Sequence, residues 1–151
     1  MRVEIAPLEA RDRQRWGALA LGYKTFYETV VSEAGYELAS QRLCAGDGVH
    51  GLGARLDRSL VGIAHFLFHA NVWMAEACHL QDLFVDEAVR GRGVARALIE
   101  GVAARARERG AARLYWHTRA NNVAARALYD KVAHHDGFIR YDCALPAAPA
   151  H

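Results

Sequence analysis

Cysteine, proline and long apolar runs are all scarce in this 151-residue chain. Its three cysteines, Cys44, Cys78 and Cys143, are too few and too widely spaced for a disulfide framework or a paired-cysteine metal site, which indicates a reducing compartment. No apolar run is long enough to cross a bilayer, and the first residues carry no apolar segment of a signal peptide. We therefore expect a cytoplasmic protein with no membrane partner.

A surplus of charge of one sign is also absent. The 19 basic and 17 acidic side chains give a formal net charge of +2, too weak a field to favour a polyanion, so we expect no nucleic-acid partner. The eight histidines show no ligand spacing of a structural zinc site, so we expect no metal. The length suits one domain, which we place at residues 1–146, followed by a loose tail at residues 147–151.

The apolar pattern predicts a mixed α/β fold. Short alternating or apolar runs predict strands at residues 3–5, 49–56, 60–68, 77–85, 113–118 and 138–145. Helical periodicity predicts about four helices, at residues 9–27, 36–44, 94–109 and 122–132. The polar turn at residues 57–59 favours an antiparallel hairpin, whereas the helix at 94–109 makes the strands before and after it parallel. We therefore expect a sheet with an antiparallel front half and one parallel strand pair.

A glycine-rich turn joins the strand at 77–85 to the helix at 94–109, with the sequence Arg90-Gly91-Arg92-Gly93-Val94-Ala95. The first backbone N–H groups of a helix have no partner inside it, and together with the helix dipole they favour an anion. Glycine lets the backbone approach a ligand and adopt a positive φ, and the two arginines can add charge-assisted hydrogen bonds. The turn therefore predicts a site for a phosphate or pyrophosphate group.

Two common phosphate motifs do not fit this turn. The dinucleotide fingerprint requires a third glycine or alanine where Arg96 stands, and the nucleotide P-loop requires a Gly-Lys-Ser/Thr ending that is absent. The pattern Arg/Gln-x-x-Gly-x-Gly/Ala does fit, and it resembles the coenzyme A loop of the GNAT superfamily of N-acetyltransferases.

The flanking segments strengthen this resemblance. Residues 80–85 are similar to the family's Leu-x-x-Leu-x-Val strand, and residues 122–129 are similar to its Asn-x-x-Ala-x-x-Leu-Tyr helix, with Gly137-Phe138 after it. Glu87 stands where the family often has proline, residues 132–136 lengthen the usual gap before Gly137, and residues 1–79 match only in element order. The runs at 115–118 and 129–132 look like a branch of small enzymes that acetylate amines, amino acids or histone tails.

The resemblance implies a GNAT-like sheet whose parallel strands splay around a coenzyme site. It also implies an N-acetyltransferase that moves the acetyl group of acetyl-CoA, its co-substrate, to a primary amine of a small molecule or protein by direct attack in a ternary complex. The alternative is a non-catalytic acyl-CoA sensor or scaffold that keeps the same site. Homodimers are common in such folds, so a second copy is a candidate partner.

The same resemblance assigns the coenzyme to three segments. The strand would hold the pantetheine arm, and a backbone N–H near Phe84 or Val85 is a candidate oxyanion donor, so the strand residues are Leu83, Phe84 and Val85. The turn would hold the pyrophosphate through Gly91, Arg92, Gly93, Val94 and Ala95, with Arg90 either in contact or holding the loop. Asn122 would bind the coenzyme arm, although Asn122 and Asn121 are also candidate helix caps.

Catalytic groups are assigned in the same way. Tyr129 occupies the family's position for the general acid that protonates the leaving thiolate; helical spacing alone would make it an aromatic residue packed on the sheet. Asp82 is the candidate base or ammonium anchor, unless it is a solvated strand residue or the partner of an arginine. Glu28 and His79 are alternative bases, and a desolvated amine needs no dedicated base.

Acceptor contacts are expected from the end of the first helix. By fold analogy, Tyr27 and Glu28 form a wall of the acceptor site, whereas Tyr23 and Phe26 belong to the core.

Overall fold

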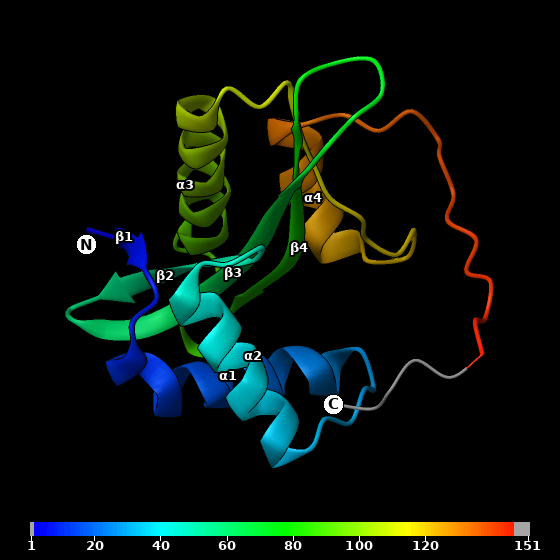
Figure 1. Cartoon of the computed structure of the whole chain (residues 1–151). Helices are drawn as coiled ribbons and strands as arrows, with labels where there is room; N and C mark the ends of the chain where they lie inside the picture. The colour runs from blue at the N-terminus through cyan, green and yellow to red at the C-terminus, as the bar shows by residue number, and fades with distance from the viewer. Residues whose placement is uncertain (1, 147–151) are drawn as a thin grey trace. The chain divides into compact units, whose positions relative to one another are not determined.

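A five-stranded sheet forms the framework of the chain, of which the computed structural model describes residues 2–146 (Figure 1). The sheet order is the chain order, and the strands are β1 (Glu4–Pro7), β2 (His50–Leu56), β3 (Ser59–His69), β4 (Ala77–Val85) and β5 (Arg113–Tyr115). The strands from β1 to β4 pair antiparallel, and β4 pairs with β5 in parallel. The predicted mixed sheet, with an antiparallel front half and one parallel pair, is therefore confirmed.

The connections explain the two kinds of pairing. Between β2 and β3, Asp57 and Arg58 both adopt left-handed backbone angles, with φ of 48° and 69°. Positive φ at both central residues is typical of a type I′ turn, whose twist matches that of the flanking strands. The helix α3 (Val94–Arg109) carries the chain from β4 to β5, and a crossover of this kind makes the two strands parallel.

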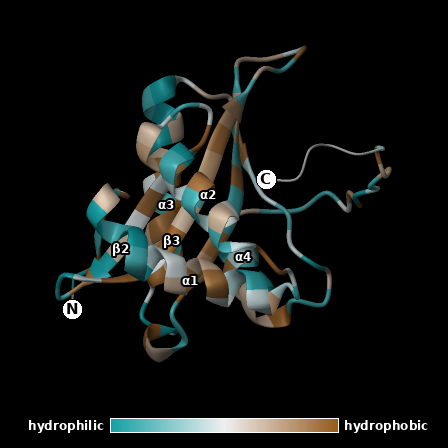
Figure 2. Cartoon of the chain, turned by 60° about the horizontal axis from the view of Figure 1, so that its bottom comes forward, coloured by the Kyte–Doolittle hydropathy of each residue, from teal (hydrophilic) through white to brown (hydrophobic). Residues whose placement is uncertain are grey.

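One face of the sheet is covered by α1 (Arg13–Phe26) and α2 (Glu33–Ala45) (Figure 1). Trp16 and Leu19 of α1 form a buried cluster with Leu60 and Ile63 of β3, and this cluster is the core on this side. The strands between the helices are largely hydrophobic, as Figure 2 shows. Burial of these apolar side chains is the main force that holds α1 on the sheet.

The other face is covered by α3. Gly62 comes directly before Ile63 on β3, so a side chain at position 62 would lie on the opposite face of the sheet. A Cβ on Gly62 would lie only 3.0 Å from Leu98 Cδ1 and 3.1 Å from Val94 Cγ1, so the helix packs closely against the strand at this glycine. Leu98 and Val102 are completely buried and Ala106 is 5% exposed, so α3 packs on the sheet along most of its length.

Local signals explain the helix starts. Ser32 caps α2 by accepting a hydrogen bond from the Gly35 amide (3.1 Å), so the helix begins at Glu33, before the predicted start at residue 36. The first helix begins at Arg13 rather than at residue 9 because a short 3-10 turn, η1 (Ala10–Asp12), precedes it. The number of helices and their order agree with the prediction.

The residues up to His117 form one compact unit and those from Thr118 form a second. In the second unit, α4 (Val123–Val132) is the one helix or strand within the described residues. The predicted strand at 138–145 is wrong, since these residues are not part of any sheet and Phe138 is 92% exposed. A strand requires a neighbour for its backbone hydrogen bonds, which alternating side chains do not supply.

Two further predictions lie at the limits of the described residues. The loose tail at 147–151 falls outside them, and a single domain over residues 1–146 stays a prediction. Within residues 2–146, no helix has the length and apolar character that crossing a bilayer requires.

Candidate active site

The glycine turn lies between β4 and α3, as expected. The chain leaves β4 through a short 3-10 turn, η2 (Glu87–Val89), which Asp86 caps. Gly91 and Gly93 then adopt left-handed φ angles of 82° and 78°. A Cβ at either position would meet no atom within 4 Å, so it is the backbone angle, and not crowding, that favours glycine. The space beside both glycines is open.

The start of α3 presents backbone donors. Gly93 is the N-cap and has no side chain to cap the helix, and a helical hydrogen bond runs from the Ala97 amide to the Gly93 carbonyl oxygen (3.0 Å). The amides of residues 94–96 therefore have no acceptor inside the helix. Val94 is buried against the sheet, while residues 91–93 are exposed. Because the dipole of this 16-residue helix also favours an anion, the turn fits a pyrophosphate.

Arg90 stabilises the loop before the helix. Its Nε donates to the Val85 carbonyl oxygen (3.3 Å), and its Nη1 is 3.4 Å from Glu87 Oε1. Its guanidinium also lies over the Phe84 ring, 5.7 Å from the ring centre. Of the two roles left open for Arg90, these contacts favour holding the loop.

The edge of β4 next to β5 is only partly covered. The parallel pairing joins Ala77–His79 to Arg113–Tyr115 and ends there, although β4 continues to Val85 and the partner strand was predicted to reach residue 118. On its other side β4 pairs with β3, with a bulge at Gln81. Within the described residues, no strand covers residues 80–85 on the β5 side, so their outward backbone groups can hold an extended ligand arm. This segment contains Leu83, Phe84 and Val85.

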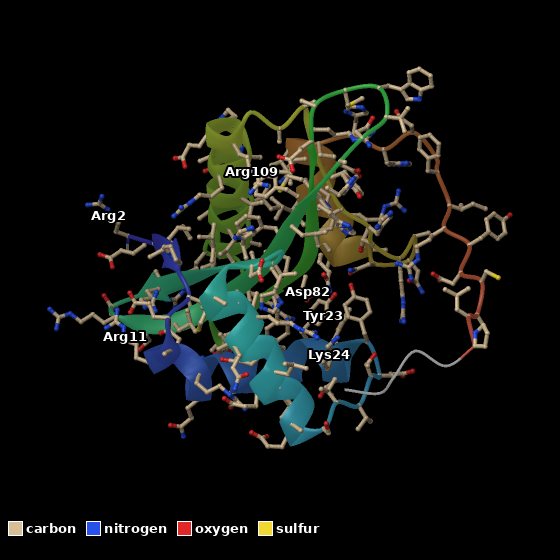
Figure 3. The ribbon with its side chains drawn as sticks, viewed as in Figure 1. Arg2, Arg11, Tyr23, Lys24, Asp82 and Arg109 are labelled. Atoms are coloured by element: carbon tan, nitrogen blue, oxygen red, sulfur yellow. The ribbon has the colours of Figure 1, made fainter. Side chains whose placement is uncertain are left out.

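Asp82 is held by side chains from β3 and α1, and not by an arginine. Its Oδ2 accepts a hydrogen bond from His65 Nδ1 (2.8 Å), and the two side chains are 13% and 14% exposed. Tyr23 and Lys24 of α1 lie beside it (Figure 3). Burial raises the pKa of Asp82, but the hydrogen bonds from His65 and Tyr23 and the electrostatic attraction of His65 and Lys24 outweigh it, so the pKa lies below its ordinary value.

The sequence does not predict the partners of Asp82. His65 comes from β3, and Trp16, whose Nε1 donates to His65 Nε2 (2.9 Å), comes from α1. These residues are 49 positions apart in the chain. The signal that could have found them is a histidine on the inward-facing side of a strand, since a buried imidazole needs hydrogen-bond partners.

A second polar cluster lies where the pairing of β4 and β5 ends. The His79 ring packs on Tyr115, with centroids 4.7 Å apart, and lies 5.4 Å from the ring of His117. His69 Nε2 is 2.7 Å from the Tyr115 hydroxyl oxygen. Burial and the neighbouring His117 and His69 lower the pKa of His79, despite the opposite effect of Asp82. His79 is therefore neutral at neutral pH and able to accept a proton.

The end of α1 gathers aromatic side chains. The ring of Tyr27 lies 4.9 Å from that of Tyr23 and 5.0 Å from that of Phe26. Phe26 is 56% exposed, so its predicted place in the core is wrong; periodicity predicts a helix face but not where the sheet beneath it ends. Glu28 is exposed and has a positive φ of 56°. Tyr27 and Glu28 therefore lie together directly after the helix, and their role as an acceptor wall stays a prediction.

In the second unit, Tyr129 lies on α4 and is partly buried. Asn122 is the N-cap by position, but its side chain makes no capping hydrogen bond; its Nδ2 donates to Thr118 Oγ1 (3.1 Å). The carbonyl oxygen of Asn121 accepts from the Val123 amide (2.9 Å). The side-chain cap considered for Asn122 is therefore not observed. Among residues 2–146, no group of three His, Cys, Asp or Glu side chains could hold a metal ion.

Comparison with known proteins agrees with this geometry. Residues 16–134 match the acetyltransferase (GNAT) family. The D-amino-acid N-acetyltransferase HPA3 of Saccharomyces cerevisiae is 32% identical over 146 residues, which cover 93% of this chain and 89% of that protein. The crystal structure of a ribosomal-protein-alanine N-acetyltransferase from Brucella melitensis biovar Abortus 2308 is similar with a TM-score of 0.77 and 26% identity, over 95% of this chain and 100% of that one.

A neighbour with lower identity shares the fold. The aminoglycoside N-acetyltransferase AAC(6')-Iy, solved in complex with CoA, has a TM-score of 0.78 and 18% identity, over 94% of this chain and 96% of its own. The family match covers most of the chain and includes β4, the glycine turn and α4. The chain therefore belongs to the GNAT family of acetyltransferases and is an enzyme of acyl transfer to nitrogen.

Proposed function

We propose that this enzyme transfers the acetyl group of acetyl-coenzyme A to a primary amine by direct attack in a ternary complex. The observation that carries the proposal is the open glycine turn at the start of α3, reached from a strand with a partly uncovered edge. The two features match the two recognisable parts of acetyl-CoA, a charged pyrophosphate and an extended pantetheine arm with amide groups.

Backbone groups provide most of the proposed coenzyme site. The amides that open α3 bind the pyrophosphate, Arg92 adds positive charge, and Arg90 keeps the loop in shape. The outward backbone groups of β4 bind the pantetheine arm, and Asn122, whose side chain does not cap α4, contributes an amide. The proposed coenzyme residues are thus Leu83, Phe84, Val85, Arg90, Gly91, Arg92, Gly93, Val94, Ala95 and Asn122.

The protein's contribution to the chemistry is the placement of charges and protons. Bound acetyl-CoA supplies a thioester that the amine attacks, with loss of the coenzyme thiolate. A backbone N–H near Phe84 or Val85 stabilises the negative charge that develops on the carbonyl oxygen. Tyr129 donates its phenolic proton to the leaving sulfur.

The acceptor amine must lose a proton to attack. Because the pKa of Asp82 lies below its ordinary value, its carboxylate is a weak base, and we assign it to attracting the ammonium form of the acceptor. His79, whose pKa is also lowered, is neutral at neutral pH and is the better proton acceptor. Of the two roles left open for Asp82, the proposal therefore keeps the ammonium anchor.

The proposed acceptor is a small amino acid or a related primary amine. HPA3 is named for D-amino acids, and the Brucella enzyme is named for the alanine of a ribosomal protein. Asp82 and Lys24 place a negative and a positive charge side by side, which suits a molecule that carries both an ammonium and a carboxylate group (Figure 3). Tyr27 and Glu28 would form the nearby wall of the acceptor site.

Thiol release from acetyl-CoA in the presence of a panel of amines tests this function. We expect release with amino acids and none without an amine. Binding of acetyl-CoA, measured as a rise in melting temperature, with no turnover on any amine would contradict the proposal and favour a sensor or scaffold. A failure to bind acetyl-CoA would overturn the coenzyme assignment itself. The cytoplasmic location and the homodimer stay predictions.

A further inference from the structure

A buried series of hydrogen bonds connects α1 to β4 through β3. Trp16 Nε1 donates to His65 Nε2 (2.9 Å), and His65 Nδ1 is 2.8 Å from Asp82 Oδ2. Tyr23 of α1 hydrogen-bonds to the same carboxyl group. Trp16 and Tyr23 are about two helical turns apart, so α1 contacts both ends of the series. We call Trp16, His65, Asp82 and Tyr23 the α1 clamp.

The indole of Trp16 determines which nitrogen of His65 carries the proton. An indole N–H can only donate, so His65 Nε2 must present its lone pair. A neutral imidazole then carries its one proton on Nδ1, which points at the Asp82 carboxylate. The carboxylate can only accept, so the Tyr23 hydroxyl donates to it. Each hydrogen bond of the clamp therefore has a fixed donor and a fixed acceptor as long as His65 is neutral.

The clamp fixes which ring nitrogen of His65 presents a proton to Asp82. A second proton on His65 would place an Nε2–H group opposite the N–H of Trp16, where neither can accept. It would also place an imidazolium beside the carboxylate. Opposite His65, β2 carries only Gly51. The titratable groups near the pair are Tyr23 and Lys24 of α1, Tyr36 of α2 through its ring contact with Trp16, and His79 of β4.

We propose that Trp16 and His65 are positioning residues that hold Asp82 as an oriented anion, ready to capture the ammonium group of the acceptor. The indole does so by occupying the lone pair of Nε2, so that the single proton of the neutral imidazole lies on Nδ1 and faces the carboxylate. This inference rests on the proposed function, in which Asp82 anchors the ammonium group. The clamp also fixes the last turn of α1, directly before Tyr27 and Glu28.

The tautomer of His65 tests the clamp without any substrate. Long-range proton–nitrogen correlation spectra of the unliganded protein at about pH 8 should show His65 with its proton on Nδ1. A His65 that carries its proton on Nε2, or both protons at neutral pH, would overturn the proposal whatever the enzyme acetylates.

Trp16→Phe tests the consequence for the acceptor. The variant keeps a ring against Tyr36 but lacks the indole donor, so the proton of a neutral His65 is no longer held on Nδ1. Relative to wild type, its KM for the amine should rise about tenfold, because the hydrogen bond that orients Asp82 is no longer enforced, while kcat and KM for acetyl-CoA stay within about twofold. Tyr36→Phe, the matched control, changes the other ring of the same contact and should keep the wild-type KM for the amine. A wild-type KM for the amine in Trp16→Phe would contradict the proposal.

A pair of His65 variants covers the case in which Trp16→Phe does not fold. His65→Asn places an amide N–H near the position of Nδ1, whereas His65→Leu has no donor. The Asn variant should bind the amine about tenfold better than the Leu variant, and equal KM values would contradict the proposal. If wild type turns over no amine, the proposed function fails, while the tautomer measurement still decides whether the clamp exists.

Discussion

The glycine turn and the α1 clamp are built in opposite ways. The turn consists of neighbouring backbone amides, is exposed, and depends on the left-handed angles of Gly91 and Gly93. The clamp consists of side chains from three elements, with partners 49 and 17 residues apart, and its His65–Asp82 pair is mostly buried. The turn offers donors to an anion, while the clamp presents an anion of its own. Changes in the turn should therefore affect the coenzyme, and changes in the clamp should affect the amine.

A negative charge in the turn should have the largest effect. In Gly93→Asp, a carboxylate would face the coenzyme pyrophosphate, at a cost of about 4 kcal/mol per close charge pair, or about a thousandfold in affinity. Isothermal titration with acetyl-CoA measures the loss. Undiminished binding would refute the placement of the pyrophosphate at this turn.

Gly110→Asp is the matched control for this variant. Gly110 ends the same helix with nearly the same backbone angle, φ 77° against 78° for Gly93. Both variants should lose similar stability from an unfavourable backbone angle, yet only Gly93→Asp should lose coenzyme affinity. Equal losses of affinity would mean that general destabilisation, and not charge at the turn, is responsible.

Tyr129→Phe should have the second largest effect. Without the phenolic proton, kcat should fall about a hundredfold, while the Kd of acetyl-CoA stays within about twofold. Tyr141→Phe is the control within the same unit, because Tyr141 is exposed and should tolerate the change. Pre-steady-state thiol release measures the chemical step, and an unchanged rate would remove Tyr129 from the mechanism.

Asp82→Asn should have a smaller effect on activity, through binding of the amine and not of the coenzyme. Its KM for the amine should rise about tenfold because the anchoring charge is gone, while coenzyme affinity is kept. The folded-state pKa of Asp82 is lowered, so its charge stabilises the fold above the unfolded-state pKa, and this contribution is lost as the pH falls through the folded-state pKa. Melting temperatures measured against pH should therefore fall less steeply toward acid in Asp82→Asn than in wild type.

Asp12→Asn separates the effect of a lost carboxylate on stability from its effect on KM for the amine. Asp12 is also buried, which raises its pKa, but the hydrogen bonds from Arg55 and the Glu9 amide and the charges of Arg55 and Arg11 together lower it below its ordinary value. This variant should flatten the acid side of the stability curve without changing KM for the amine. An equal rise in KM for both variants would show that lost stability, and not the position of Asp82, weakens amine binding.

Tyr36→Phe should have the smallest effect. The Tyr36 hydroxyl is buried and has no hydrogen-bond partner among the described residues. Removing an unsatisfied hydroxyl should leave the free energy of unfolding unchanged or raise it by up to about 1 kcal/mol. Urea denaturation measures this, and a clear loss of stability would mean that the hydroxyl is hydrogen-bonded in solution.

Prediction from the sequence succeeded where the signal is local. The mixed sheet, the hairpin at residues 57–59, and the strand, glycine turn and helix between residues 77 and 109 all depend on neighbouring residues or on simple periodicity. Prediction failed where a segment depends on contacts with another part of the chain. The segment 138–145 alternates like a strand but lies in no sheet, and Phe26 continues the apolar pattern of α1 but is largely exposed.

The sequence by itself determined the family, the glycine turn and the order of the elements, because glycine angles and helix amides are properties of a few consecutive residues. Only the tertiary structure decided that Asp82 is held by His65 and Trp16, and that Arg90 braces the loop. These contacts depend on which face of α1 packs on which face of the sheet. That choice is made by burial of the whole core, so no single stretch of sequence contains it.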